Sequence, residues 1–106
     1  MKIRLLPAAE EDLLDSYRFY EAQRDGLGDG FLDALYSNIE SLRITAGVHV
    51  RCFGSFYRLL AKRFPFAVYY RLNEGEIRVF AVLDTRPSPA RARQLPSGRE
   101  RTGEGC

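Results

Sequence analysis

The sequence predicts an α+β fold in which one strand and two amphipathic helices precede a small antiparallel sheet. Apolar residues recur at helical spacing between residues 8 and 47, whereas β-branched and aromatic residues form short runs between residues 56 and 83. The expected order of elements is β-α-α-β-β-β. With 106 residues and 45% hydrophobic content, the chain can build one modest core and not two. We therefore expect a single domain over residues 1–95.

The chain is expected to open with a short strand and then to change to a helix. Ile3 and Leu5 alternate with charged residues, and Pro7 ends this run because proline suits the first turn of a helix. Acidic residues follow at positions 10–12, where carboxylates stabilise the positive end of a helix dipole. The apolar stripe of this helix consists of Ala9, Leu13, Tyr17 and Tyr20, and Leu14 widens it.

A second helix is expected after a break at residues 24–28, which include two glycines. Gly47 is suited to end this helix because glycine readily adopts the left-handed conformation of a helix C-terminus. The two helices then form a hairpin, and we interpret the aromatic residues of both stripes as core residues rather than ligand contacts. The stripe of the second helix consists of Phe31, Leu35, Ile39 and Leu42.

Three strands are expected in the second half of the chain. Residues 66–72 and 77–83 are rich in valine, tyrosine and other strand-forming residues, and Gly75 between them suits a hairpin turn. Residues 56–61 form the preceding strand, and Pro65 belongs at the junction because proline cannot donate a ladder hydrogen bond. The three strands therefore form an antiparallel meander.

Residues 48–55 lack a clean period and are expected to form a loop that leads into the meander. His49, the only histidine of the chain, lies there and is a candidate general acid or base because imidazole titrates near neutrality. No carboxylate lies at a sequence spacing from His49 that would indicate a catalytic pair, so the simpler interpretation of His49 is a solvated side chain.

Charge is segregated along the chain. Residues 1–47 hold five basic and nine acidic side chains, whereas residues 48–86 hold seven basic and three acidic ones. This asymmetry indicates that the later part meets an anionic partner such as a nucleic acid or an acidic protein segment. The alternative is that arginines at exposed strand positions only maintain solubility.

Several other classes of function find no support in the sequence. No apolar run approaches the roughly 20 residues that cross a bilayer, and the N-terminus lacks a secretory apolar segment, so we expect a cytoplasmic protein without membrane contact. Glycine motifs for phosphate cofactors and clusters of metal ligands are missing, so we expect no cofactor. Residues 96–106 have almost nothing apolar to bury and are expected to form a disordered tail.

In three sequence segments the chain resembles the RelE/ParE toxins of bacterial type II toxin-antitoxin modules, often called plasmid stabilization proteins. The segments are Pro7-Ala-Ala-Glu-Glu-Asp-Leu13, Phe31-Leu-Asp-Ala-Leu35, and the run from Tyr57 to Arg71 together with the strand end at Val79 to Arg86. The resemblance covers about residues 2–95. It implies the RelE/ParE-like α+β fold and two alternative mechanisms.

The RelE-like alternative is cleavage of mRNA on the ribosome. Basic side chains would hold the phosphate and stabilise the charge that develops during attack by the ribose hydroxyl. The tyrosine that RelE-like members often carry near the C-terminus is missing, since nothing after Phe80 is aromatic. The candidate residues for this activity are Arg58, Lys62, Arg63, Arg71, Arg86 and His49.

The ParE-like alternative, which the sequence suits better, is inhibition of DNA gyrase by binding, without a catalytic constellation. A third alternative is a homologue that has lost toxicity and only binds its antitoxin. In all three cases the resemblance implies a cognate antitoxin whose disordered segment folds across the toxin. We expect Arg58, Arg71 and Arg78 to contribute to the surface that binds the antitoxin or the target.

Overall fold

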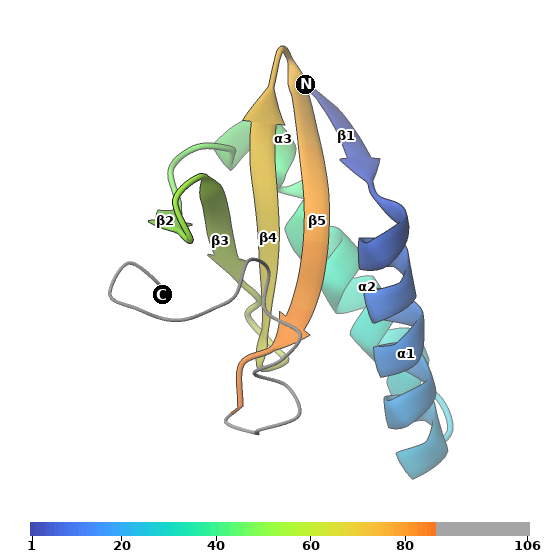
Figure 1. Ribbon diagram of the computed structural model, residues 1–106. Coiled ribbons are helices and arrows are strands. Elements are labelled where there is room, and N and C mark those ends of the chain that lie inside the picture. Colours follow the sequence, from blue (N-terminus) through green and yellow to red (C-terminus); the bar gives the residue numbers. More distant parts are fainter. Residues whose placement is uncertain (87–106) are drawn as a thin grey trace.

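The computed structural model describes residues 1–86, which form a five-stranded sheet with helices packed on one face (Figure 1). Residues 87–95 of the predicted domain and the predicted tail at 96–106 lie outside the described residues. The α+β order of elements that the sequence predicts is confirmed. The elements are β1 (Lys2–Leu5), α1 (Pro7–Gln23), α2 (Leu27–Glu40), α3 (Leu42–Thr45), β2 (Val50–Cys52), β3 (Phe56–Leu60), β4 (Phe66–Asn73) and β5 (Glu76–Asp84).

The strands lie in the order β1-β5-β4-β3-β2. Strands β2 to β5 pair in antiparallel fashion with their neighbours in sequence, as a meander does. Strand β1 pairs with β5 in parallel, with Ile3 opposite Ile77. Parallel pairing needs a long crossover connection, which the helices between β1 and the meander provide. The first strand therefore joins the edge of the sheet.

The prediction of a loop over residues 48–55 is wrong for Val50–Cys52. These three residues form β2 and pair with Phe56–Arg58 of β3, so the meander has four strands rather than three. Strand β2 lies at the sheet edge, and Val50 and Arg51 are both exposed. Alternation of buried and exposed residues is therefore absent, which is why the sequence pattern gave no sign of a strand.

The second predicted helix is divided into α2 and the single turn α3, which follow each other across Ser41. The helical region ends at Thr45, two residues before the predicted stop at Gly47. Gly47 has a φ of 96°, which suits glycine, and its backbone N–H donates to the Tyr70 hydroxyl at 2.9 Å. A side chain of the central strand thus anchors the end of the helical region.

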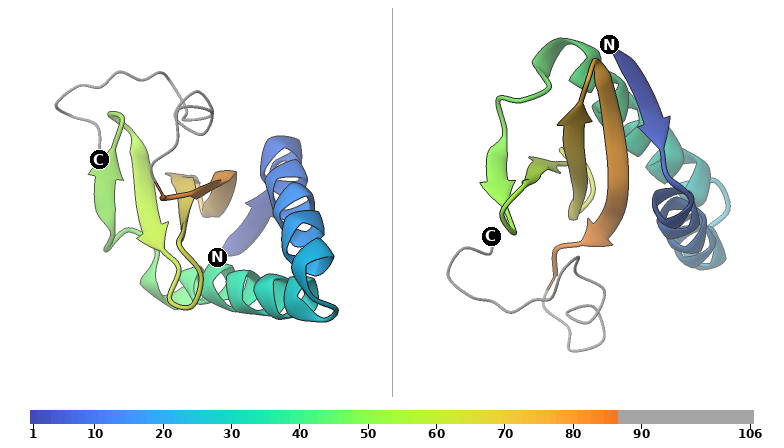
Figure 2. Two further views of the ribbon diagram at one scale, coloured as in Figure 1. Left: turned by 90° about the horizontal axis from the view of Figure 1, so that it is seen from below. Right: turned by 45° about the horizontal axis from the view of Figure 1, so that its top comes forward.

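The main core lies between the helices and one face of the sheet, as the two views of Figure 2 show. Of the predicted apolar stripes, Tyr17 is only half-buried and Leu14 is exposed, contrary to expectation, whereas the other members are buried. The ring centroid of Phe31 lies 5.2 Å from that of Tyr20, 5.3 Å from that of Phe64 and 5.0 Å from that of Phe66. These aromatic contacts join both helices to the β3–β4 connection and β4.

The turn between α1 and α2 depends on one carboxylate and two glycines. Glu21 accepts hydrogen bonds from the backbone N–H groups of Gly26 at 2.9 Å and of Gly28 at 2.8 Å. It thereby satisfies donors at the start of α2 that no helical carbonyl reaches. Gly28 is buried against α1, where an added Cβ would lie 2.7 Å from a ring carbon of Tyr17.

The substitution Gly28→Ala is therefore expected to lower the free energy of unfolding by about 1–3 kcal/mol, the usual cost of overpacking. Gly30→Ala, one helical turn away from the start of α2, is the matched control because an added Cβ there meets nothing within 4 Å. This control should raise the free energy of unfolding by about 0.5–1 kcal/mol. Urea denaturation of both variants measures the difference, and equal effects would contradict the packing argument.

The pairing of β4 with β5 contains a bulge. Tyr69 lies opposite Ala81 and Tyr70 lies opposite Val79, so Phe80 has no partner on β4. The extra residue reverses the alternation of β5, and Phe80 and Ala81 both pack on the face turned away from the main core. Two consecutive residues, one aromatic and one small, thus lie on that face, where regular alternation would place only one of them.

A carboxylate of α1 satisfies the backbone next to the bulge. Strand β1 ends at Leu5, which lies opposite Val79, so β5 continues without a strand neighbour on that side. Asp12 accepts a hydrogen bond from the backbone N–H of Val82 at 2.9 Å. This contact between residues 70 positions apart ties α1 to the part of β5 that β1 does not reach.

Candidate functional site

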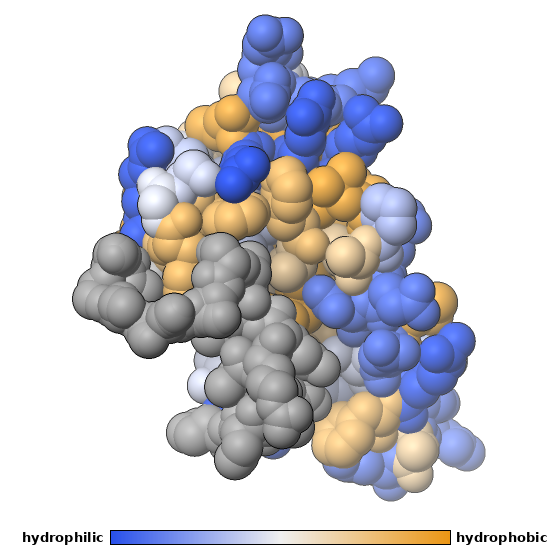
Figure 3. Space-filling model, viewed as in Figure 1, coloured by the Kyte–Doolittle hydropathy of each residue, from blue (hydrophilic) through white to orange (hydrophobic). Residues whose placement is uncertain are grey.

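The sheet face turned away from α1 and α2 carries most of the arginines of the meander, and we call it the arginine face. Alternation along the strands places these side chains there, because their neighbours Leu72, Ile77 and Val79 contact the main core. Figure 3 shows hydrophilic residues gathered around the β4–β5 turn, above an apolar area at the middle of the face. The arginine face is defined by Arg4, Arg58, Arg71 and Arg78, with Phe56, Tyr69 and Phe80 between them.

Three arginines form a row across three adjacent strands. Arg4 of β1 lies opposite Arg78 of β5, and Arg78 lies opposite Arg71 of β4. Neighbouring strands are about 4.8 Å apart, so the row spans about 10 Å between the outer Cα atoms. The sequence alone could not reveal this row, because it depends on which strand lies beside which.

Glu76 holds two of the three arginines in place. Its Oε1 accepts a hydrogen bond from Arg78 Nε at 2.6 Å. Its other carboxylate oxygen, Oε2, lies 3.6 Å from Arg4 Nη1. The hydrogen bond from Arg78, followed by the nearby positive charges, lowers the pKa of Glu76 below its ordinary value. One carboxylate therefore orients two guanidinium groups, and a net positive charge remains on this part of the face.

Arg71 is held by aromatic rings instead. Its guanidinium carbon lies 4.3 Å from the ring centroid of Phe56 and 5.1 Å from that of Phe80. Phe80 reaches this position only because of the bulge in β5. Within residues 1–86, no carboxylate lies within ion-pair distance of Arg71. Stacking leaves the N–H groups at the edge of the guanidinium available to an anionic partner.

Arg58 lies in the next row of the face, opposite Tyr69. Its Nε is buried and has no hydrogen-bond partner among the described atoms. Burial raises the pKa of the Tyr69 hydroxyl, and the positive charge of Arg58 opposes this rise in part. A buried donor without an acceptor is costly, so an acceptor brought by a partner would stabilise this site.

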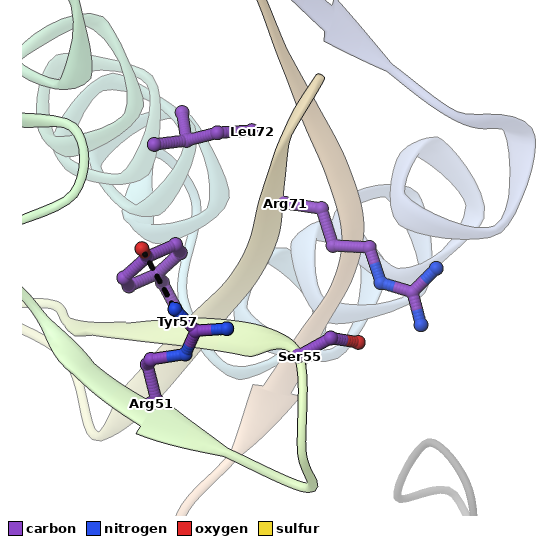
Figure 4. A pocket seen from close by; sticks show the side chains of 5 residues that line it. All are labelled: Arg51, Ser55, Tyr57, Arg71 and Leu72. Atoms are coloured by element: carbon purple, nitrogen blue, oxygen red, sulfur yellow. Dashed lines mark hydrogen bonds between the residues drawn. The ribbon is translucent and has the colours of Figure 1, made fainter.

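A hollow of about 310 Å³ lies beside the row, where β4 runs past the start of β3 (Figure 4). Arg51 and Tyr57 line one side of it, and the Arg51 guanidinium donates to the Tyr57 hydroxyl at 3.3 Å. Figure 4 shows the side chains of Arg71 and Ser55 extending away from that pair. Sequence reasoning missed Arg51 and Ser55, because their roles depend on the unrecognised strand β2.

The other candidate residues lie apart from the arginine face. Lys62 and Arg63 are in the turn between β3 and β4, where the Lys62 backbone N–H donates to Asn38 of α2 at 3.3 Å. Arg86 lies just beyond the end of β5 and forms a bidentate pair with Asp84, with distances of 2.5 and 3.0 Å. This pair raises the pKa of Arg86.

His49 lies on the helix side of the sheet. Its Nδ1 is 2.5 Å from the hydroxyl oxygen of Tyr70, a fully buried core residue that also accepts from Gly47. The Tyr70 hydroxyl can donate to His49 only when the imidazole is neutral, and burial lowers the pKa of His49 from 6.5. This geometry assigns His49 an anchoring contact for the segment between α3 and β2.

The His49 contact predicts a pH dependence of stability. Because the pKa of His49 is lower in the folded protein, the unfolded chain binds more protons between that value and about 6.5. The stabilisation is therefore complete above about pH 6.5 and is lost as the pH falls through the folded pKa. We expect urea unfolding between pH 5 and 8 to show this loss. His49→Gln should flatten the curve, and an unchanged slope in that variant would contradict the assignment.

The arrangement suits anion binding rather than acid-base chemistry. Over residues 1–86, the four arginines of the face are not accompanied by a histidine, and Glu76 is already engaged by Arg78 and Arg4. The described residues contain no group of three or more potential metal ligands. In the same part of the chain, no helix is long and apolar enough to span a membrane.

These features define a small α+β protein of ParE-like fold with a basic sheet face. Neither a family model nor a curated protein sequence matches the chain. Among solved structures, it is similar to one described as a chromosomal ParDE TA system from P. aeruginosa, with a TM-score of 0.67. The alignment has 18% identity and covers 77% of this chain and 92% of that chain. The ParE-like fold implied by the sequence resemblance is confirmed by this likeness.

Proposed function

We propose that this protein is the toxin of a type II toxin-antitoxin module and that it acts in the cytoplasm by binding DNA gyrase. The observation that carries the proposal is a ParE-like fold whose arginine face has anion-binding groups and, among residues 1–86, no acid-base pair beside them. The solved structure with this fold is described as a ParDE toxin-antitoxin system, which supports an antitoxin as partner.

Neutralisation by an antitoxin is supported by the charge and the aromatic rings of the arginine face. Arg58, Arg71 and Arg78 present donors on a surface that also carries the rings of Phe56 and Phe80. An extended segment with acidic and apolar side chains complements such a surface. Occupation of these arginines by the antitoxin would remove them from any other partner.

The proposal is tested by the supercoiling of relaxed plasmid by gyrase, with and without the purified chain. We expect inhibition together with cleaved DNA trapped on the enzyme. Purified antitoxin, expressed from a neighbouring short reading frame, should restore supercoiling. Unaffected gyrase would overturn the proposal.

Ribosome-dependent cleavage of mRNA is the competing function, and the positions of its candidate residues count against it. His49 lies on the helix side of the sheet, whereas Arg58 and Arg71 lie on the arginine face. Lys62, Arg63 and Arg86 belong to the opposite end of the meander from Arg71. A translation reaction with the purified chain, followed by mapping of mRNA ends, would reveal this activity.

A further inference from the structure

We infer that the arginine face binds the phosphate backbone of duplex DNA, so that the toxin holds DNA as well as gyrase. This inference rests on the proposed function for its biological setting, but DNA binding itself is a separate property. Of the four arginines of the face, only Arg4 and Arg78 pair with a carboxylate among the described residues, and both pair with Glu76. The partner that balances such a surface is strongly anionic.

The direction of the arginine row favours a regular polyanion. Arg4, Arg78 and Arg71 follow one another across the strands, at intervals of about 4.8 Å. A partner that runs along one strand meets only one of these arginines, whereas one that crosses the strands meets all three, and a chain of phosphates supplies a negative charge at every interval of the row. Duplex DNA carries a charge about every 1.7 Å of helix axis, so each arginine finds a phosphate without base recognition.

The row extends beyond its three arginines at the edge of the sheet. Lys2, Arg4 and Arg78 line a hollow of about 320 Å³ beside the β4–β5 turn, together with the carboxylates of Glu74 and Glu76. Lys2 contributes to the positive potential at Glu76, since its charge helps to lower the pKa of that carboxyl. A phosphate group at this hollow would meet three cations and two carboxylates, so positive charge would still be in excess there.

The guanidinium groups are oriented before any partner arrives. Phe56 and Phe80 fix Arg71, and the Glu76 carboxylate fixes Arg78. Ordered side chains lose less conformational entropy on binding, so each phosphate contact is stronger than one made by a mobile surface lysine. The unpartnered Nε of Arg58 is a further donor for an oxygen acceptor.

DNA binding by this face would contribute both to the inhibition of gyrase and to neutralisation by the antitoxin. Gyrase holds a DNA segment while it acts, and a toxin that contacts both components stabilises the complex of the two. An acidic antitoxin segment that occupies Arg71 and Arg78 competes with the phosphates for the same donors. Neutralisation then requires no change in the shape of the toxin.

The test is fluorescence anisotropy of a labelled 20-base-pair duplex titrated with the full chain at 50 and 200 mM salt, without gyrase. Three phosphate contacts predict a salt slope of about −2.7, which corresponds to an affinity loss of about 40-fold between the two concentrations. Arg71→Gln and Arg78→Gln should each lower the affinity at 50 mM salt and reduce the slope by about 0.9.

Arg18→Gln is the matched control, because Arg18 lies exposed on α1 and pairs with Asp15 at 3.3 Å, away from the arginine face. It changes the net charge equally and should leave DNA binding within about 2-fold of the native chain. Circular dichroism confirms that each variant is folded. Equal losses in Arg18→Gln and Arg71→Gln would overturn the inference.

Other results also decide the question. Preference for a single-stranded RNA of equal length, or binding only to an acidic peptide, would overturn DNA as the partner. Gyrase inhibition that persists in Arg71→Gln after DNA binding is lost would support DNA binding by the face, overturn its contribution to gyrase inhibition, and leave the proposed function standing. DNA binding without gyrase inhibition would support the inference and overturn the proposed function.

Discussion

Replacing Phe31 by alanine is expected to lower the free energy of unfolding by about 3–5 kcal/mol. Phe31 is fully buried, and its ring contacts those of Tyr20, Phe64 and Phe66 at centroid distances of 5.0 to 5.3 Å. Removal of the ring leaves a cavity where α1, α2 and the sheet meet. Chemical denaturation monitored by circular dichroism measures the loss, which approaches the whole stability of a small domain.

Phe19→Ala is the control for this substitution. Phe19 belongs to α1 and is 45% exposed, so its removal creates no buried cavity. We expect a loss below about 1 kcal/mol, typical of a surface position. A comparable loss in the two variants would mean that the aromatic cluster around Phe31 does not carry the stability of the core.

Reversal of charge at Arg71 is expected to weaken binding of the antitoxin by about 30- to 1000-fold, which corresponds to about 2–4 kcal/mol. The guanidinium lies over the rings of Phe56 and Phe80, so Arg71→Glu removes a fixed donor and places a negative charge against an acidic segment. Isothermal titration calorimetry with the antitoxin from the neighbouring reading frame provides the affinity.

Arg71→Lys and Arg18→Glu separate the contributions of geometry and charge. Lysine keeps the charge but lacks the planar group that stacks on the two rings, so we expect an intermediate loss of affinity. Arg18 belongs to α1 and its exposed side chain pairs with Asp15, so its reversal should have little effect. Unchanged affinity in Arg71→Glu would exclude Arg71 from the antitoxin surface.

Most of the fold could be predicted because its elements have strong local patterns. The stripe of Phe31, Leu35 and Ile39 repeats at helical spacing and is buried as expected. The β4–β5 hairpin follows from two runs of strand-forming residues around Gly75, which has a φ of 79°. Strand β2 was missed because it is three residues long and exposed at the sheet edge.

Less of the candidate site could be predicted from the sequence. Strand alternation correctly placed Arg71 on the face opposite Tyr70 and Leu72. The contact of Arg71 with the Phe80 ring was not predictable, since it depends on a β-bulge that no local sequence pattern indicates. The pairing of His49 with Tyr70 joins residues 21 positions apart, and nothing in the spacing of either residue indicates it.

The sequence by itself determined the order and type of the principal elements and the segregation of charge along the chain. Both are local properties, set by the period of apolar residues and by composition. Only the tertiary structure decided which sheet face the helices cover and that β1 lies beside β5. These choices depend on contacts between distant segments, and they bring Arg4, Arg78 and Arg71 into one row.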